Sequence, residues 1–269
     1  MGVGSNMLQS LARVLRPAPW RYELLHSERR HRLIWIIQGQ GRILFGPRMR
    51  GISPGTLLFI PARQNFVLEA GSNTNGHVLH ADPPSSPLWP DQPMLVRSGQ
   101  LYNQSALQTE LDAIQREQDI ELSHKAAALQ ARLSLCAVWL QRQLLQMPLA
   151  EKPNAADRVI ERFLALLEKR YNSNDAMADY AENLNLTATH LSRVCKAQLG
   201  RSAADLIAQR TLHAARDMLE TTGHPAKEIA KNLGFGTAAY FSRYIVNHTG
   251  QTPRQLRQQA RQNTRSVGL

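Results

Sequence analysis

One stretch determines how the C-terminal half folds: Glu228-Ile229-Ala230-Lys231-Asn232-Leu233-Gly234-Phe235, followed by Tyr240-Phe241-Ser242-Arg243. An earlier segment resembles it residue by residue. Asp179-Tyr180-Ala181-Glu182-Asn183-Leu184-Asn185-Leu186 matches the first part at an offset of 49 residues, and His190-Leu191-Ser192-Arg193 matches the second at an offset of 50. The match predicts two copies of one structural unit, at about residues 176–200 and 225–250.

Each copy predicts a helix, a tight turn and a second helix. Asn185 and Gly234 stand at the turns, and both residue types tolerate the left-handed backbone that ends a helix. Thr187 and Thr237 are N-cap residues for the helices that follow. The arrangement is a helix-turn-helix, in which the second helix enters the major groove of DNA.

Helical spacing divides each second helix into an inward and an outward face. The outward residues, which we expect to meet DNA, are Thr189, Ser192, Arg193 and Lys196 in the first unit and Ala238, Ala239, Ser242 and Arg243 in the second. Arginine can donate to both major-groove acceptors of guanine or clamp a phosphate, and alanine allows close approach or contacts a thymine methyl. One such motif is a moderate signal, but two in register are specific.

The segment between the two units predicts a long helix over residues 203–220. Apolar and small residues recur there at helical spacing: Ile207, Thr211, Ala214, Ala215 and Met218. About twenty helical residues span about 30 Å, close to the length of about 34 Å of one DNA turn. The segment is either a core helix or a rigid spacer between two reading heads, and one helix can serve as both.

Charge favours a polyanionic partner. The 269 residues, enough for about two domains, carry 32 basic against 21 acidic side chains, a net charge of +11 and a pI near 10.2. Nucleic acid is the commonest such partner, and an anionic membrane surface is the alternative. Residues 1–153 carry +5 and the remainder +6, and no acidic residue follows Glu228.

The N-terminal half begins as β structure and ends as helix. Turn residues separate short apolar runs at residues 33–37, 43–45, 57–60 and 78–79, which predicts a small antiparallel barrel or sandwich over residues 29–97. Residues 104–146 predict two helices that form a dimer surface or pack on their own domain. The predicted organisation is an N-terminal domain at 1–147, a linker at 148–154 and a C-terminal domain at 155–269.

The C-terminal half resembles the AraC/XylS family of bacterial transcription regulators. The resemblance covers about residues 157–258 and rests on Ile229-Ala230, Gly234-Phe235, Tyr240-Phe241-Ser242-Arg243 and Gly250-Gln251-Thr252-Pro253-Arg254. Ile245, Val246 and Leu256 depart from the family pattern, where Phe, Lys and Tyr are usual. Departures at Ile245 and Val246 put core packing and a phosphate contact of the second unit in doubt.

The resemblance implies an α+β fold. It would combine a cupin-like antiparallel β-barrel that senses a small-molecule effector, two dimerisation helices, and an all-α domain with two helix-turn-helix units joined by a long helix. It also implies a homodimer that binds promoter or operator DNA, with RNA polymerase as a further partner. Residues that could line an effector pocket are Arg32, Trp35, Phe59 and Phe66, although the aromatic ones are more typical of a core.

Enzymatic chemistry is not expected in the barrel. Cupin enzymes bind a metal through His and Glu at set spacing, and His31, Glu69, His77 and His80 do not follow that spacing. We therefore predict no catalytic residue, no metal and no cofactor. The two cysteines, Cys136 and Cys195, are interpreted as apolar structural thiols, with redox sensing as the alternative.

Two other functions remain open: a cupin-type small-molecule enzyme fused to a DNA-binding tail, and a non-specific basic DNA-binding protein. A metal with turnover would favour the first, and equal binding of random duplex would favour the second. No apolar run reaches about 18 residues, and residues 1–6 lack the pattern of a signal peptide, which predicts a cytoplasmic protein. Either Met1 or Met7 could be the natural start.

Overall fold

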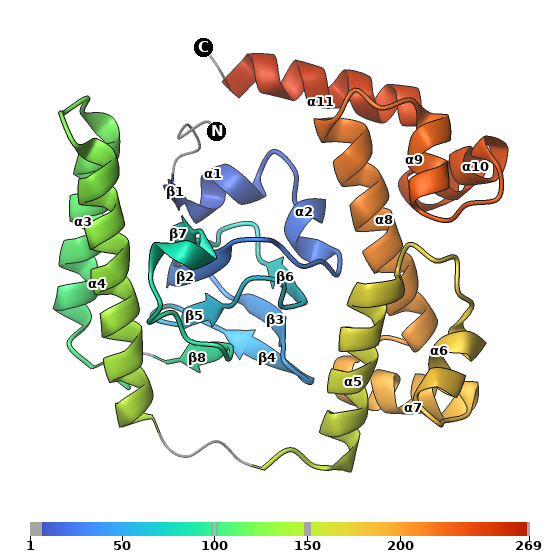
Figure 1. The fold of residues 1–269 in the computed structure, drawn as a ribbon, viewed down its shortest axis with the longest axis horizontal. Coiled ribbons are helices and arrows are strands. Elements are labelled where there is room, and N and C mark those ends of the chain that lie inside the picture. Colours follow the sequence, from blue (N-terminus) through green and yellow to red (C-terminus); the bar gives the residue numbers. More distant parts are fainter. Residues whose placement is uncertain (1–6, 98, 101, 148–151, 268–269) are drawn as a thin grey trace. The chain divides into compact units, whose positions relative to one another are not determined.

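The computed structural model describes residues 7–97, 99–100, 102–147 and 152–267, and their side chains as far as residue 262 (Figure 1). The chain divides into two compact units. The first consists of Met1–Arg16, Ser27–Phe45 and Arg50–Lys152, and the second of Pro17–His26, Gly46–Met49 and Pro153–Leu269. The predicted linker lies largely outside the described residues, at 148–151, as do the six residues that precede Met7.

The first unit contains two β-sheets. The five-stranded sheet has the order β1-β7-β2-β5-β8, and the three-stranded sheet has the order β4-β3-β6. The strands are β1 (Leu8–Ser10), β2 (His31–Gln38), β3 (Gly41–Phe45), β4 (Arg48–Ile52), β5 (Leu57–Ile60), β6 (Phe66–Ala70), β7 (Asn75–Ala81) and β8 (Met94–Val96). Strand β7 pairs antiparallel with both β1 and β2, and β3 pairs antiparallel with β6. The four predicted strand regions lie within β2, β3, β5 and β7, whereas β1, β4, β6 and β8 were not predicted.

One face of the larger sheet packs against helices. Strand register sets Leu33 opposite Phe59 and Trp35 opposite Leu57, so these side chains share one face. That face joins the core formed with the two following helices, α3 (Gln104–Asp119) and α4 (Lys125–Gln146). Both helices coincide with the helical region predicted over residues 104–146. An α+β fold with antiparallel sheets is thus observed.

The second unit is built mainly from helices. They are α5 (Ala155–Arg170), α6 (Met177–Asn183), α7 (Ala188–Leu199), α8 (Ala203–Thr221), α9 (Ala226–Asn232), α10 (Ala238–Thr249) and α11 (Pro253–Val267). Helix α5 starts at a capping box, in which Asn154 and Asp157 each accept a hydrogen bond from the backbone of the other. Helix α8 runs between the α6–α7 pair and the α9–α10 pair (Figure 1).

Helix α8 is buried on more sides than its sequence pattern indicates. The predicted stripe included Ile207, Thr211 and Met218, which are only half-buried. Buried positions include Leu206, Leu212 and also the charged Arg210. The reason is that α8 packs against α5, α6 and α7 along one part and against α9, α10 and α11 along another. A single apolar stripe cannot describe a helix with two sets of neighbours.

A short N-terminal segment packs with this second unit. It contains α2 (Trp20–Glu23), and α2 contacts α8. The guanidinium of Arg21 lies 2.7 Å from the carboxylate of Asp217, and His26 stacks on His213 with ring centroids 4.3 Å apart. These contacts, made by residues nearly 200 positions apart, explain why Pro17–His26 does not group with the β-sheets that follow it. No helix among the described residues is long and apolar enough to cross a bilayer.

Candidate nucleic-acid interface

The first helix-turn-helix unit is formed by α6 and α7. Asn185 has a φ of 57°, the left-handed conformation that reverses the chain between the two helices. The predicted N-cap Thr187 accepts a hydrogen bond of 3.1 Å from the backbone N–H of His190. Tyr180 of α6 is buried and meets Phe163 of α5 edge to face, with ring centroids 6.0 Å apart. The unit is therefore anchored on the apolar face of α5.

The second unit, formed by α9 and α10, repeats these features. Gly234 has a φ of 76°, and an added Cβ there would lie 2.7 Å from the carbonyl oxygen of Asn172. The predicted N-cap Thr237 accepts a hydrogen bond of 3.1 Å from the N–H of Tyr240. Gly200 and Gly250 end the two second helices with φ of 71° and 70°. Both helix-turn-helix units thus have a left-handed turn residue, an N-cap threonine and a C-cap glycine at matched positions of the repeat.

The side chains expected to meet DNA lie on the open faces of α7 and α10. The exposed ones are Thr189, Arg193, Lys196, Ala239 and Arg243, and the half-buried ones are Ser192, Ala238 and Ser242. On the opposite face of α7, Leu191 and Cys195 are buried, as are Phe241 and Ile245 on α10. Each second helix therefore carries one exposed arginine at the same place in the repeat.

Two positions on the open faces, the half-buried His190 and the exposed Tyr240, are not among the DNA-contacting residues predicted from the sequence. His190 accepts a hydrogen bond at Nδ1 from Nη2 of Arg193, one turn away on α7, at 3.1 Å. Tyr240 holds the matching place on α10 and is 53% exposed. A signal was present, because both residues stand three positions before the repeated arginine and so share its helical face.

Contacts along α8 connect the two helix-turn-helix units. The Tyr244 hydroxyl on α10 donates a hydrogen bond of 2.8 Å to the carbonyl oxygen of Ala208, and burial raises the pKa of Tyr244. Toward the first helix-turn-helix unit, the Arg210 guanidinium donates to Glu168 of α5 at 2.8 and 3.0 Å and lies 3.6 Å from the centre of the Tyr171 ring. Helix α5 in turn packs against α7. Such contacts hold the two recognition helices, α7 and α10, at a set separation within the C-terminal compact unit.

The four residues predicted for an effector pocket lie on opposite sides of the five-stranded sheet, and Phe66 itself belongs to the three-stranded sheet. Trp35 and Phe59 belong to the core beneath α3 and α4. Arg32 belongs to the opposite face of β2, and its guanidinium lies 5.5 Å from the ring centre of Phe66 on β6. Arg32 also pairs with Glu28. Alternation along β2 explains the division, because residues 32 and 35 differ by an odd number of positions.

The N-terminal histidines are dispersed rather than clustered. His77 is half-buried, and His80 is 6% exposed with no hydrogen-bond partner for Nδ1 among the described residues. Burial, with the nearby Arg32 and Arg30, lowers the pKa of His80 to about 3. No group of three or more His, Cys, Asp or Glu side chains within the described ranges could hold a metal ion. Both cysteines are buried, and burial raises their pKa to about 12.

Two helix-turn-helix units with exposed basic second helices define a DNA-binding protein. The family model described as a helix-turn-helix domain matches residues 180–259. The chain is 24% identical over 255 residues to an uncharacterised HTH-type transcriptional regulator, YfiF, of Bacillus subtilis, covering 86% of this chain and 77% of that protein. It is 27% identical over 117 residues to the arabinose operon regulatory protein of Escherichia coli, covering 44% of this chain and 40% of that protein.

Among solved structures, the chain resembles the C-terminal domain of the two-component response regulator yesN of Fusobacterium nucleatum. The identity is 28% with a TM-score of 0.36, over 37% of this chain and 98% of that domain. The domain match and the relatives agree with the resemblance carried by the sequence motifs. The chain is a DNA-binding transcription regulator, with a helix-turn-helix domain at residues 180–259, and it is similar to regulators such as the arabinose operon regulatory protein.

Proposed function

We propose that the chain binds its operator sequence-specifically by inserting α7 and α10 into successive major-groove segments. The observation that carries this proposal is the repeat of one exposed arginine, Arg193 and Arg243, on two second helices joined through α8. The 19 residues of α8 span about 28 Å, near the length of about 34 Å of one DNA turn. One face of a duplex can therefore meet both helices.

Each predicted side chain has a role in this arrangement. Arg193 and Arg243 donate to guanine edges, and Lys196 contacts a phosphate. Ala238 and Ala239 present small surfaces that allow α10 to approach the groove and contact thymine methyl groups. Thr189, Ser192 and Ser242 add hydroxyl contacts to bases or phosphates. The two recognition helices thus differ in chemistry, since α7 presents more polar side chains to DNA than α10 does.

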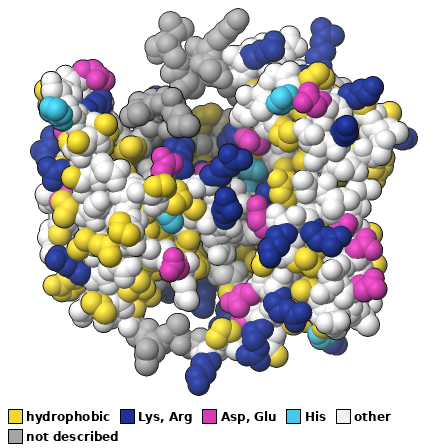
Figure 2. All heavy atoms as spheres, in the orientation of Figure 1, with side chains coloured by type: hydrophobic (Ala, Val, Ile, Leu, Met, Phe, Trp, Pro, Cys, Tyr) yellow, Lys and Arg dark blue, Asp and Glu magenta, His cyan; other side chains and the backbone are white. Residues whose placement is uncertain are grey.

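The N-terminal unit is proposed to sense an effector and to form a homodimer. Its fold is proposed to be cupin-like, with Arg32 and Phe66 as the predicted pocket residues that contact one another. Helix α4 leaves Leu135 and Leu145 46% and 82% exposed, and hydrophobic side chains gather on the face over α4 in Figure 2. Exposed apolar surface of this kind suits a subunit interface.

The proposed output is a change in transcription, with RNA polymerase as partner, in the cytoplasm and without enzymatic turnover. A cupin-type enzyme with a DNA-binding tail is the second function considered, and the dispersed histidines give it little support. A non-specific basic DNA-binding protein is the third. The matched arginines argue for base reading rather than for charge alone.

Selection of bound sequences from random duplex, followed by competition, tests the proposal. Specific sites typically bind at least about a thousandfold tighter than random duplex at the same salt concentration. We expect a selected site to outcompete random duplex by that margin. Equal competition by both duplexes would show a non-specific basic protein instead.

A further inference from the structure

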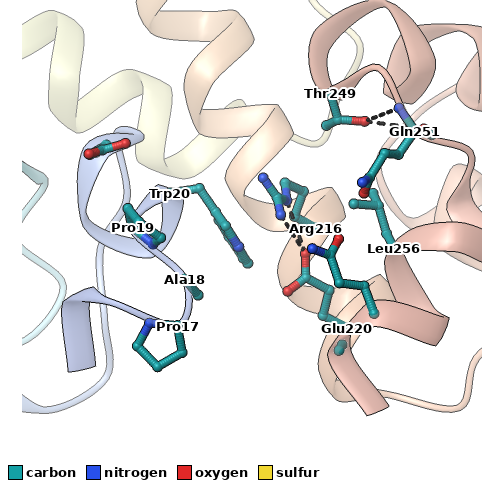
Figure 3. A pocket seen from close by; sticks show the side chains of 12 residues that line it. Pro17, Ala18, Pro19, Trp20, Arg216, Glu220, Thr249, Gln251 and Leu256 are labelled. Atoms are coloured by element: carbon teal, nitrogen blue, oxygen red, sulfur yellow. Dashed lines mark hydrogen bonds and ion pairs between the residues drawn. The ribbon is translucent and has the colours of Figure 1, made fainter. Parts of the chain in front are cut away.

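A pocket of about 360 Å³ opens within the C-terminal unit, between the segment that contains α2 and helices α8 and α11. Pro17, Ala18 and Trp20 lie on one side of it, and Glu220 and Leu256 lie on the other (Figure 3). The volume is within the usual range for a small-molecule site, about 300–1,000 Å³. The pocket is separate from the exposed faces of α7 and α10.

The wall formed by the N-terminal segment is held in place by charged groups. The guanidinium carbons of Arg216 and Arg21 lie 4.3 and 4.6 Å from the ring centre of Trp20. Arg21 in turn pairs with Asp217 at 2.7 Å. These cation–π and ionic contacts order the wall before any ligand arrives, which lowers the entropic cost of binding.

The carboxylate of Glu220 accepts a hydrogen bond at one oxygen and, within the described part of the chain, none at the other. Its side chain is 10% exposed, and Oε1 accepts a hydrogen bond of 3.0 Å from Nε of Arg216 and forms an ion pair of 2.9 Å with Nη2 of the same residue. Oε2 forms an ion pair of 3.9 Å with Nη2 of Arg21, a distance too long for a hydrogen bond. Burial raises the pKa of Glu220 and lowers the pKa of Arg216. A donor placed beside Oε2 would relieve the desolvation of this carboxylate.

The charge of the lining opposes the charge of the chain. The ionisable residues that line the pocket are Glu23, Glu220 and Arg216, a net charge of −1 on a protein of +11. Arg216 is already paired with Glu220, and Glu23 is exposed and makes no ion pair among the described residues. Pro17 and Leu256 add apolar surface next to these carboxylates.

We propose that this pocket binds a small organic cation, a primary amine with a compact apolar body. The ammonium group donates to Oε2 of Glu220 and is attracted by Glu23, and the apolar body packs on Pro17 and Leu256. The ligand touches α8, which connects the two DNA-reading units, and also Thr249, the last residue of α10, and Gln251 just beyond that helix. The inference concerns ligand binding alone and does not rest on the proposed DNA recognition.

Titration of the full chain at pH 7 with three probes of one shape tests this: cyclohexylmethylamine, cyclohexylmethanol and cyclohexanecarboxylate, followed by ligand-observed NMR. We expect the amine to bind about tenfold or more tighter than the alcohol, since a charged hydrogen bond contributes at least about 1.5 kcal/mol. Glu220→Gln should reduce amine affinity to that of the alcohol. Glu23→Gln should weaken only the amine, and it tests the same site should Glu220→Gln fail to fold.

The matched control is Glu161→Gln, which removes an exposed carboxylate of α5 and should leave amine binding unchanged. Four results would overturn the proposal. The first three are tighter binding of the carboxylate than of the amine, equal binding of the amine and the alcohol, and no binding of the amine at millimolar concentration. The fourth is a loss of amine affinity in Glu161→Gln equal to that in Glu220→Gln.

Discussion

Tyr244 on the second recognition helix donates a 2.8 Å hydrogen bond to the carbonyl oxygen of Ala208 on the connector helix α8. The bond joins α10, which carries Arg243, to the helix that also packs against α7. Since α8 contacts both second helices, the separation of the two arginines depends on bonds of this kind. The reading geometry is therefore a property of the core of this unit and not of the exposed residues alone.

Removal of that hydrogen bond should lower stability measurably. Tyr244→Phe keeps the packed ring and loses only the hydroxyl, so we expect a loss of about 0.5–1.5 kcal/mol in the free energy of unfolding. Urea denaturation measures it. Tyr240→Phe removes a hydroxyl from an exposed ring on the same helix and should change stability by less than about 0.5 kcal/mol. Equal losses in both variants would show that the Tyr244 bond contributes nothing.

The turn between α9 and α10 should tolerate only glycine at position 234. Gly234→Ala places a Cβ 2.7 Å from the Asn172 carbonyl oxygen at a φ of 76°, so we expect it to cost at least about 1–3 kcal/mol. Gly236→Ala is the matched control, because nothing lies within 4 Å of its added Cβ. Thermal unfolding of the two variants compares them. A stable Gly234→Ala variant would contradict the turn geometry.

Arg193 and Lys196 should give different binding phenotypes. Arg193→Ala should cost about 1–3 kcal/mol at one base position if the contact is bidentate to guanine. Lys196→Ala should weaken binding to all sequences alike and reduce the salt slope by about one. Binding to a panel of single-base variants at several salt concentrations separates these outcomes. A uniform loss with Arg193→Ala would assign Arg193 to a phosphate.

His80 should make the N-terminal unit sensitive to acid. Burial lowers its pKa from 6.5 to about 3, so the folded chain holds the ring neutral while the unfolded chain protonates it. Its contribution to stability is present above pH 6.5 and is lost as the pH falls toward 3, by up to about 1.4 kcal/mol per pH unit. His80→Gln should flatten this dependence in urea denaturation, and the exposed His124→Asn should not. An identical pH dependence in wild type and His80→Gln would refute this role.

Both thiols should be unreactive in the folded chain. Burial raises the pKa of Cys136 and of Cys195 to about 12, so little thiolate exists at pH 8. An aromatic disulfide reagent should label neither cysteine in the native protein and both after denaturation. Rapid labelling of one native thiol would restore the redox-sensing alternative.

The sequence predicted the DNA-reading half in detail because its turns and caps are local. Thr187 and Thr237 interact with backbone groups three residues away, and Gly234 has a conformation that its residue type indicates. Because the two helix-turn-helix units repeat one sequence pattern, the turn and the N-cap residue were each predicted in both units. His190 and Tyr240 were missed although the same register places them on the arginine face.

Long-range packing could not be predicted in this way. The docking of Trp20 and Arg21 on α8 joins residues nearly 200 positions apart, and their local sequence carries no signal for it. The predicted effector residues suffered from a different problem: Trp35 and Arg32 were grouped by residue type, whereas strand alternation assigns them to opposite faces. The short strand β4 has a polar sequence that lacks the apolar run of a buried strand.

Guanine methylation interference on a selected binding site tests the central claim most directly. Two second helices in successive major-groove segments predict two clusters of sensitive guanines about ten base pairs apart on one face of the duplex. Arg193→Ala should remove one cluster, and Arg243→Ala should remove the other. A single cluster, or loss of the same guanines in both variants, would contradict DNA recognition by two separate helices.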